Sequence, residues 1–174
     1  MVRKFYTVLI IILTILISLS IQINFLNMIP LFGVVANLGI IVIVGFGLMN
    51  GKIIGGLTGA LYGLLTDITF CKIIGINLFL YTIVGLITGQ ISSKFSKDNK
   101  TSMVMIVVVT TAIFELIHCI LLNIITGSSI SFFRMIIIIS IEVAYNFLIT
   151  AILHKFIVGL GEIINKSKSS YYLL

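Results

Sequence analysis

The chain has 174 residues, of which 60% are hydrophobic and only 9% are charged, and its mean hydropathy is +1.30. A soluble domain is about 45–50% apolar and about 25% charged, and a water-soluble fold of this size could not bury so much apolar surface. The composition indicates an integral membrane protein, and it excludes a cytosolic enzyme, a nucleic-acid-binding domain and a disulfide-rich secreted module despite the formal net charge of +6.

Six apolar stretches are long enough to cross a bilayer, which takes about 20 mostly apolar residues in a helix. Because these stretches are continuously apolar, they do not match the alternating pattern of β-barrel strands. We expect an all-α integral membrane protein in which residues 1–164 form one six-transmembrane-helix bundle, followed by a short cytoplasmic tail at 165–174. The predicted spans lie at about 5–23, 29–48, 53–70, 73–92, 102–125 and 132–158.

Lysine and arginine are distributed unevenly between the two sides of this bundle. With the N-terminus inside, nine of these residues fall on the cytoplasmic side, and only Lys72 and Arg134 fall on the other side. Cytoplasmic loops carry the excess of positive charge, so both termini are expected in the cytoplasm. The loops between the spans are all short, and any activity is therefore expected among the helices or in their contacts with partners.

Glycines recur every four residues in the third and fourth predicted spans. Gly55, Gly59 and Gly63 form one stripe, and Gly85 and Gly89 repeat the spacing. Small residues at this spacing let the backbones of membrane helices approach closely. The stripe indicates either tight packing inside the bundle or a face for a partner's helix, and the sequence leaves both open.

A second motif joins Asp67, at the end of the third span, to Gly75 and Asn77 at the start of the fourth. A carboxylate is poorly placed at the C-terminus of its own helix, where the dipole favours cations. Asp67 could instead accept hydrogen bonds from the N-terminus of the fourth helix, or it could pair with Lys72. We expect it to fasten this hairpin, with a ligand or proton role as the alternative.

Two glutamates lie inside predicted spans. Glu115 and Glu142 are equally distant from the short loop between the fifth and sixth spans, so an antiparallel hairpin places them at the same depth. His118 shares the helix face of Glu115. Because ionised carboxylates in lipid are costly, we expect these three residues to form a buried, hydrogen-bonded polar cluster with one acid protonated. A proton or cation path is the alternative.

No metal, cofactor or enzyme activity is expected. A di-iron bundle needs two Glu-x-x-His motifs and two further glutamates, whereas only one such motif, Glu115 to His118, is present. The sequence also contains no G-x-S-x-G, H-E-x-x-H or P-loop motif. Cys71 and Cys119 form no C-x-x-C pair and are expected to be small packing residues.

The glycine and aspartate motifs together resemble the MreD family of rod shape-determining proteins. In that family a glycine-rich helix ends in a G-L-L-x-D-like segment, and a short turn leads to a G-x-N-like helix start. The matching segments here are 51–59, 63–67, 75–77 and Tyr81-x-x-x-Gly85-x-x-x-Gly89. One departure is the turn at 70–72, which has fewer small residues than the family pattern.

The resemblance implies a non-enzymatic scaffold subunit of the bacterial cell-elongation machinery (the elongasome). Such a protein lies in the cytoplasmic (inner or plasma) membrane as a multi-pass protein and helps control cell shape and lateral peptidoglycan synthesis. Its implied partners are MreC, a RodA-type glycosyltransferase, a class B penicillin-binding protein and, indirectly, MreB. Membrane lipid surrounds it, and nucleic acid is not among the partners.

The resemblance also implies a fold like that of the substrate-binding S-components of energy-coupling factor transporters. This likeness gives an alternative function, a substrate-binding membrane subunit for a vitamin or a metal. Three features count against the alternative: the sequence has no tryptophan, the predicted outer loops are short, and residues 8–17 lack an alanine-rich docking stripe.

Overall fold

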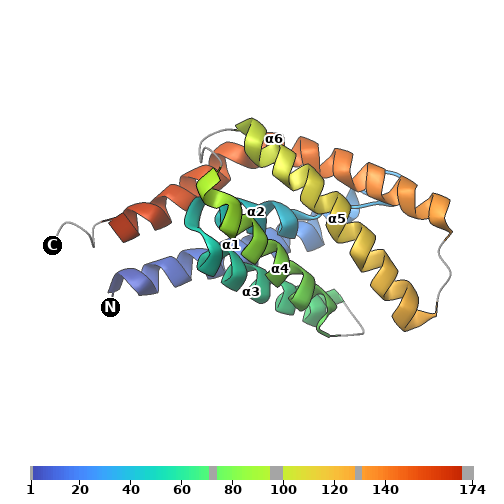
Figure 1. Ribbon diagram of the computed structural model, residues 1–174, viewed down its shortest axis with the longest axis horizontal. Helices are drawn as coiled ribbons and strands as arrows, with labels where there is room; N and C mark the ends of the chain where they lie inside the picture. The colour runs from blue at the N-terminus through green and yellow to red at the C-terminus, as the bar shows by residue number, and fades with distance from the viewer. Residues whose placement is uncertain (1, 71–73, 95–99, 128–130, 170–174) are drawn as a thin grey trace.

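A computed structural model describes residues 2–70, 74–94, 100–127 and 131–169 (Figure 1). These residues form six α-helices and two short 3-10 helices, with no strand longer than a single bridge. The all-α prediction is therefore confirmed. The elements are α1 (Val2–Asn24), η1 (Leu26–Met28), α2 (Leu38–Asn50), α3 (Lys52–Phe70), α4 (Ile76–Ile91), η2 (Ser92–Lys94), α5 (Lys100–Thr126) and α6 (Phe132–Ser169).

Four helical segments are long and apolar enough to cross a membrane, namely Tyr6–Met28, Lys52–Phe70, Lys100–Thr126 and Phe132–Ile164. The other two helices are apolar but shorter, with 13 residues in α2 and 16 in α4. At about 1.5 Å per residue they extend about 20 Å and 24 Å, against a hydrocarbon core of about 30 Å. Two of the six apolar stretches are thus shorter as helices than the sequence pattern indicated.

The largest difference concerns the predicted span at 29–48, because α2 begins only at Leu38 and none of residues 29–37 is helical. Proline at position 30 lacks a backbone donor and favours extended or turn conformations. Leu31 and Val34 form a tight antiparallel bridge with reciprocal N–H···O distances of 2.9 Å. Gly33 closes this turn with a φ of 82°, which glycine adopts readily. The segment is apolar, so its hydropathy alone predicted a continuous helix, whereas Pro30 and Gly33 favour a turn.

α2 forms the centre of the bundle, and every one of its residues is buried. It contacts all five other α-helices. A helix that is apolar on all sides belongs in a protein interior or in lipid, and here neighbouring helices cover it. The short length of α2 is therefore combined with the most complete burial in the described part of the chain.

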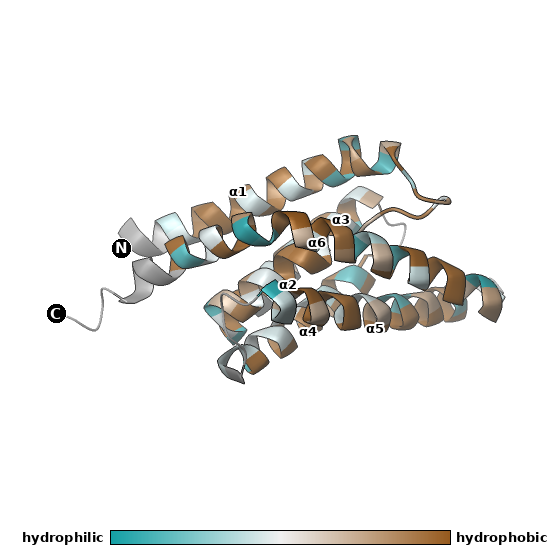
Figure 2. Cartoon of the chain, turned by 90° about the horizontal axis from the view of Figure 1, so that it is seen from above, coloured by the Kyte–Doolittle hydropathy of each residue, from teal (hydrophilic) through white to brown (hydrophobic). Residues whose placement is uncertain are grey.

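α1 lies along one side of the bundle (Figure 2). Its buried residues follow a helical spacing and form one face: Ile11, Ile15, Ser18 and Leu19. The rest of its apolar surface is largely exposed, as expected for a helix that faces lipid. The start of α1 and the end of α6 lie at the same end of the molecule (Figure 1), as an even number of antiparallel passes requires.

Candidate functional site

The predicted glycine stripe of α3 faces the backbone of α4. A Cβ atom at Gly55 would collide with the carbonyl oxygen of Gly85, and one at Gly59 would collide with the carbonyl oxygen of Tyr81. At Gly63, an added Cβ would lie 2.5 Å from the carbonyl oxygen of Asn77. No side chain fits at these positions, so the two helices touch backbone to backbone, and they form the most extensive helix pair in the described structure.

The two glycines of α4 complete this contact. Gly85 lies against Gly55, and a Cβ at Gly89 would lie 2.5 Å from the Cα atom of Lys52. All five predicted glycines therefore contact this chain's own backbone. Of the two interpretations of the stripe, the contacts favour packing inside the bundle.

The sequence analysis missed a second set of glycines between α2 and α6. A Cβ at Gly45 would collide with the side chain of Ile157, and a Cβ at Gly161 would lie 2.6 Å from the Cβ of Met49. Gly45 lies in α2 and Gly161 in α6. The contact joins single glycines of two helices that are distant in sequence, so no four-residue glycine repeat predicted it.

The Asp67 carboxylate is buried and accepts four hydrogen bonds from the start of α4. Oδ2 accepts from the backbone N–H of Gly75 at 2.8 Å and of Leu78 at 3.0 Å. Oδ1 accepts from the backbone N–H of Asn77 at 3.2 Å and from its side-chain amide at 3.0 Å. The first N–H groups of a helix lack intrahelical partners and carry the positive end of its dipole. Asp67 supplies the missing acceptors with a negative charge.

Gly75 makes this arrangement possible. Its φ of 118° lies in the left-handed region, which glycine enters without a steric cost. This conformation turns the Gly75 and Asn77 N–H groups toward the same carboxylate. The proposed alternative partner of Asp67, Lys72, lies outside the described residues.

A polar network that the sequence analysis did not identify connects distant helices near the start of α2. Asn37 Oδ1 accepts a hydrogen bond from the Tyr81 hydroxyl at 2.8 Å, and the Asn37 backbone N–H donates to Asn146 Oδ1 at 2.8 Å. The Asn146 amide donates in turn to Thr111 Oγ1 at 3.0 Å. Polar residues inside apolar helices were the available signal, but that signal does not say which of them meet.

Gln22 ties α1 into the same region. Its amide donates to the carbonyl of Ala36 at 2.7 Å, and its oxygen accepts from the backbone N–H of Leu38 at 3.0 Å. The non-helical segment before α2 is thus held by side chains from α1, α4 and α6. Side chains from other helices thus supply hydrogen-bond partners to a segment whose own backbone is not helical.

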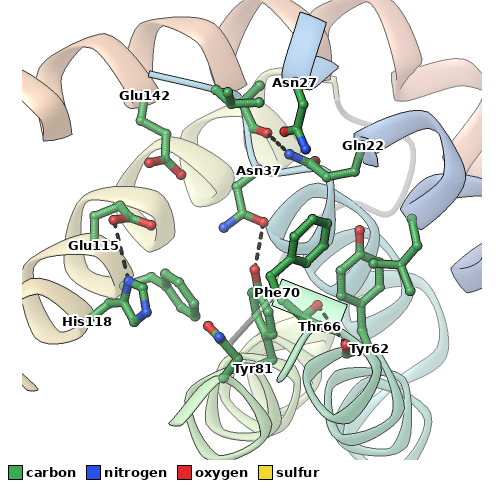
Figure 3. A pocket seen from close by; sticks show the side chains of 15 residues that line it. Gln22, Asn27, Asn37, Tyr62, Thr66, Phe70, Tyr81, Glu115, His118 and Glu142 are labelled. Atoms are coloured by element: carbon green, nitrogen blue, oxygen red, sulfur yellow. Dashed lines mark hydrogen bonds and ion pairs between the residues drawn. The ribbon is translucent and has the colours of Figure 1, made fainter. Parts of the chain in front are cut away.

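A cavity of about 270 Å³ lies beside this network, lined by residues of α1, the segment before α2, α3, α4, α5 and α6 (Figure 3). Its polar lining includes Asn37, Glu115, His118 and Glu142. Aromatic rings form another part of the lining: Tyr62, Tyr81 and Phe114. The cavity lies in the half of the bundle away from the start of α1, since it reaches Phe70 at the end of α3.

The three predicted cluster residues all line this cavity, and the hydrogen-bonded cluster stays a prediction. Glu115 and Glu142 are buried, whereas the His118 side chain is 22% exposed. His118 Nδ1 lies 3.9 Å from Glu115 Oε2, which is longer than a hydrogen bond. Glu142 points into the space between Glu115 and Asn37 (Figure 3), and its Oε1 has no hydrogen-bond partner among the described residues.

The site chemistry of the described residues is that of polar contacts between helices. They contain no group of three or more His, Cys, Asp or Glu side chains able to hold a metal ion. The free thiol of Cys119 is buried in α5. The polar side chains of this region either form hydrogen bonds between helices, as Asp67, Tyr81 and Asn146 do, or line the cavity, as Glu115 and Glu142 do.

These features define a polytopic helical membrane protein in which small and polar residues hold the helices together. The chain belongs to the MreD family: the family model described as rod shape-determining protein MreD matches residues 2–163. The predicted resemblance is therefore confirmed and extends well beyond the motifs at 51–89. MreD proteins are shape-determining structural membrane proteins, so membership implies a role in determining rod shape.

No curated protein and no solved structure matches the sequence. The likeness to S-components of energy-coupling factor transporters, inferred from the family resemblance, therefore stays a prediction.

Proposed function

We propose that the protein is a non-enzymatic scaffold subunit of the cell-elongation machinery that helps organise lateral peptidoglycan synthesis. The observation that carries this proposal is the family match over residues 2–163. The structure adds support, because the small and polar residues singled out by the family motif hold the α3–α4 hairpin together. A rigid membrane core is what a scaffold requires.

In this proposal MreC is the direct partner, and the RodA-type glycosyltransferase, the class B penicillin-binding protein and MreB are reached through the assembly. The α3 glycine stripe is covered by α4. Partner helices would therefore contact exposed apolar surface, such as the outer face of α1 at Ile12 and Leu16 or of α6 at Ile152.

Depletion and co-purification test the scaffold role. Depletion from a rod-shaped host should produce rounded or swollen cells, and tagged protein should co-purify MreC from solubilised membranes. A Gly59→Leu variant provides a matched negative control, because its membrane core should not form. Normal rods after complete depletion would contradict the proposal.

We further propose that all six helices cross the membrane and that both termini are cytoplasmic. The nine-to-two distribution of lysine and arginine supports this orientation, and so does the position of the start of α1 and the end of α6 at one end of the bundle. Cysteine labelling in intact cells tests it. Labelling of the loop at 94–100 from outside would overturn the orientation.

The alternative function, a substrate-binding membrane subunit of an energy-coupling factor transporter, is favoured by one observation, the cavity of about 270 Å³. This alternative predicts tight, specific binding of a vitamin or metal by the purified protein and no change in cell shape on depletion. The scaffold proposal predicts the opposite result in both measurements.

A further inference from the structure

We propose that the cavity between α5, α6 and the start of α2 binds a small molecule or headgroup that carries an ammonium group. The ammonium would lie between the Glu115 and Glu142 carboxyls, in a cavity whose wall includes Tyr81 and Phe114. This inference concerns a ligand site and does not rest on the proposed scaffold function.

The charge of the lining supports a cationic ligand. Glu115 and Glu142 are 8% and 6% exposed and point into one space from two different helices (Figure 3). No lysine or arginine lines this cavity, and His118 is the one basic side chain there among the described residues. Arg134 lines a separate groove that also reaches Glu142, but it precedes Glu142 by eight residues on α6, about 12 Å along the helix axis. Two carboxyls buried among helices need a cation or protons.

Glu142 supplies the second, independent observation. Its Oε1 atom is fully buried and has no hydrogen-bond partner among the described residues. A buried acceptor without a partner costs free energy. The carboxylate of Asp67, which is also buried, differs in this respect because it accepts four hydrogen bonds. Glu142 lines the cavity, so a donor that enters the cavity would lie beside this carboxyl.

Aromatic rings shape part of the cavity wall. The Tyr81 and Phe114 rings stack with centroids 4.6 Å apart, and the Tyr62 ring meets Tyr81 edge-on at 5.6 Å. The centroid of the His118 ring lies 5.7 Å from that of the Phe114 ring, so the rings pack mainly on one another, and the two carboxyls supply the attraction for the ammonium. Neutral ligands would gain from the rings but would leave the two carboxyls uncompensated.

The size of the cavity limits the ligand. A volume of about 270 Å³ lies just below the usual range of about 300–1,000 Å³ for small-molecule pockets. It admits a small amine or an ethanolamine headgroup. The same chemistry could therefore come from a free amine or from phosphatidylethanolamine in the membrane, and the experiment must separate these sources.

The test uses the full chain in nanodiscs made of phosphatidylglycerol alone. Ethanolamine is titrated by calorimetry and by thermal unfolding, with ethylene glycol as the uncharged analogue. We expect ethanolamine to bind and to raise the Tm, and ethylene glycol to do neither. In a second arm, nanodiscs contain equal parts of phosphatidylethanolamine and phosphatidylglycerol, and native mass spectrometry detects retained lipid.

Two variants make the test specific. Glu142→Gln should weaken binding at least tenfold while circular dichroism shows an unchanged helical content. Glu162→Gln, the same substitution at an exposed position of the same helix, should bind as the unaltered protein does. Retention of phosphatidylethanolamine alone, lost in Glu142→Gln, would support the site and identify the headgroup as the ligand.

The proposal is overturned by any of three results. The first is no saturable binding in either arm at millimolar ethanolamine. The second is equal binding of ethylene glycol, which would show that the charge is irrelevant. The third is an equal loss of binding in Glu142→Gln and Glu162→Gln, which would place the interaction outside the cavity.

Discussion

The α3–α4 and α5–α6 hairpins are both antiparallel helix pairs, but their helices are held together in different ways. In α3–α4, glycines bring the two backbones into contact, and Asp67 satisfies the N-terminus of the second helix. In α5–α6, the acids Glu115 and Glu142 face a cavity, and one carboxylate oxygen has no partner among the described residues. The same carboxyl chemistry thus fastens one hairpin and lines a cavity in the other.

The difference shows that the neighbours of a buried acid decide its role. Asp67 follows a glycine-lined contact, so the start of α4 lies within hydrogen-bond distance of its carboxylate. No glycine brings the α5 and α6 backbones together at Glu115 and Glu142, and the space between the helices stays open to the cavity. The following substitutions test this contrast.

The largest effect is expected at the backbone contact. Gly59→Leu places a side chain where the Tyr81 carbonyl lies, and no rotamer removes that overlap. Overpacking a core costs about 1–3 kcal/mol or more even where side chains can shift, so we expect loss of the folded protein. Membrane yield and thermal unfolding in detergent measure it.

A matched pair of alanine substitutions controls for helix propensity. Glycine to alanine in an open helical position stabilises by about 0.5–1 kcal/mol. Gly159 in α6 has nothing within 4 Å of an added Cβ, so Gly159→Ala should raise the Tm slightly, whereas Gly59→Ala should lower it. Equal Tm values for the two variants would contradict the backbone contact between α3 and α4.

The next effect is expected at Asp67. In the unaltered protein, backbone N–H groups donate to both carboxylate oxygens of Asp67. Asp67→Asn keeps one of these acceptors but replaces the other with an NH2 group, which is a donor and therefore faces backbone donors. Hydrogen bonds to charged groups contribute about 1.5–3 kcal/mol each, so we expect a loss of several kcal/mol in unfolding free energy. Denaturant unfolding compares Asp67→Asn with Glu162→Gln, an exposed acid of α6. A stable Asp67→Asn protein would show that the carboxylate charge is not required.

A smaller effect is expected at Asn146, which connects the α5–α6 hairpin to Asn37 in the segment before α2. Asn146→Leu leaves the Asn37 N–H and Thr111 Oγ1 without these partners. Each buried polar group left without a partner costs about 1–3 kcal/mol. Asn24→Ala is the control, because the exposed Asn24 side chain bonds only within its own helix at Ser20. If both variants unfold at the same temperature, the network does not stabilise the bundle.

The sequence predicted the contacts that lie close along the chain. Asp67 and Gly75 are eight residues apart, and residue types and helix ends alone indicate that they meet. Asn37 and Asn146 are 109 residues apart, and their contact depends on how α6 is rotated against α2. No periodicity within either segment records that rotation.

The start of α2 could not be predicted from hydropathy for a different reason. Residues 29–37 are apolar enough to extend a span, but Pro30 and Gly33 change the backbone, and side chains from other helices complete its hydrogen bonds. A local average of hydropathy contains neither the backbone preference nor the distant partners.

The smallest effect is expected at Glu142. Because its Oε1 has no partner among the described residues, replacement leaves few groups newly unpaired, and both Glu142→Gln and Glu142→Leu should change the unfolding free energy by no more than about 1 kcal/mol. The hydrogen-bonded cluster inferred from the sequence predicts otherwise: Gln would be tolerated, and Leu would destabilise as Asp67→Asn does. Unfolding of both variants separates these cases.

Shape complementation then tests the proton-path alternative, because an amide cannot release a proton near neutral pH. A Glu142→Gln protein that assembles fully but fails to restore rods would favour the proton path if its ethanolamine binding is unchanged, and the ligand site if that binding is lost.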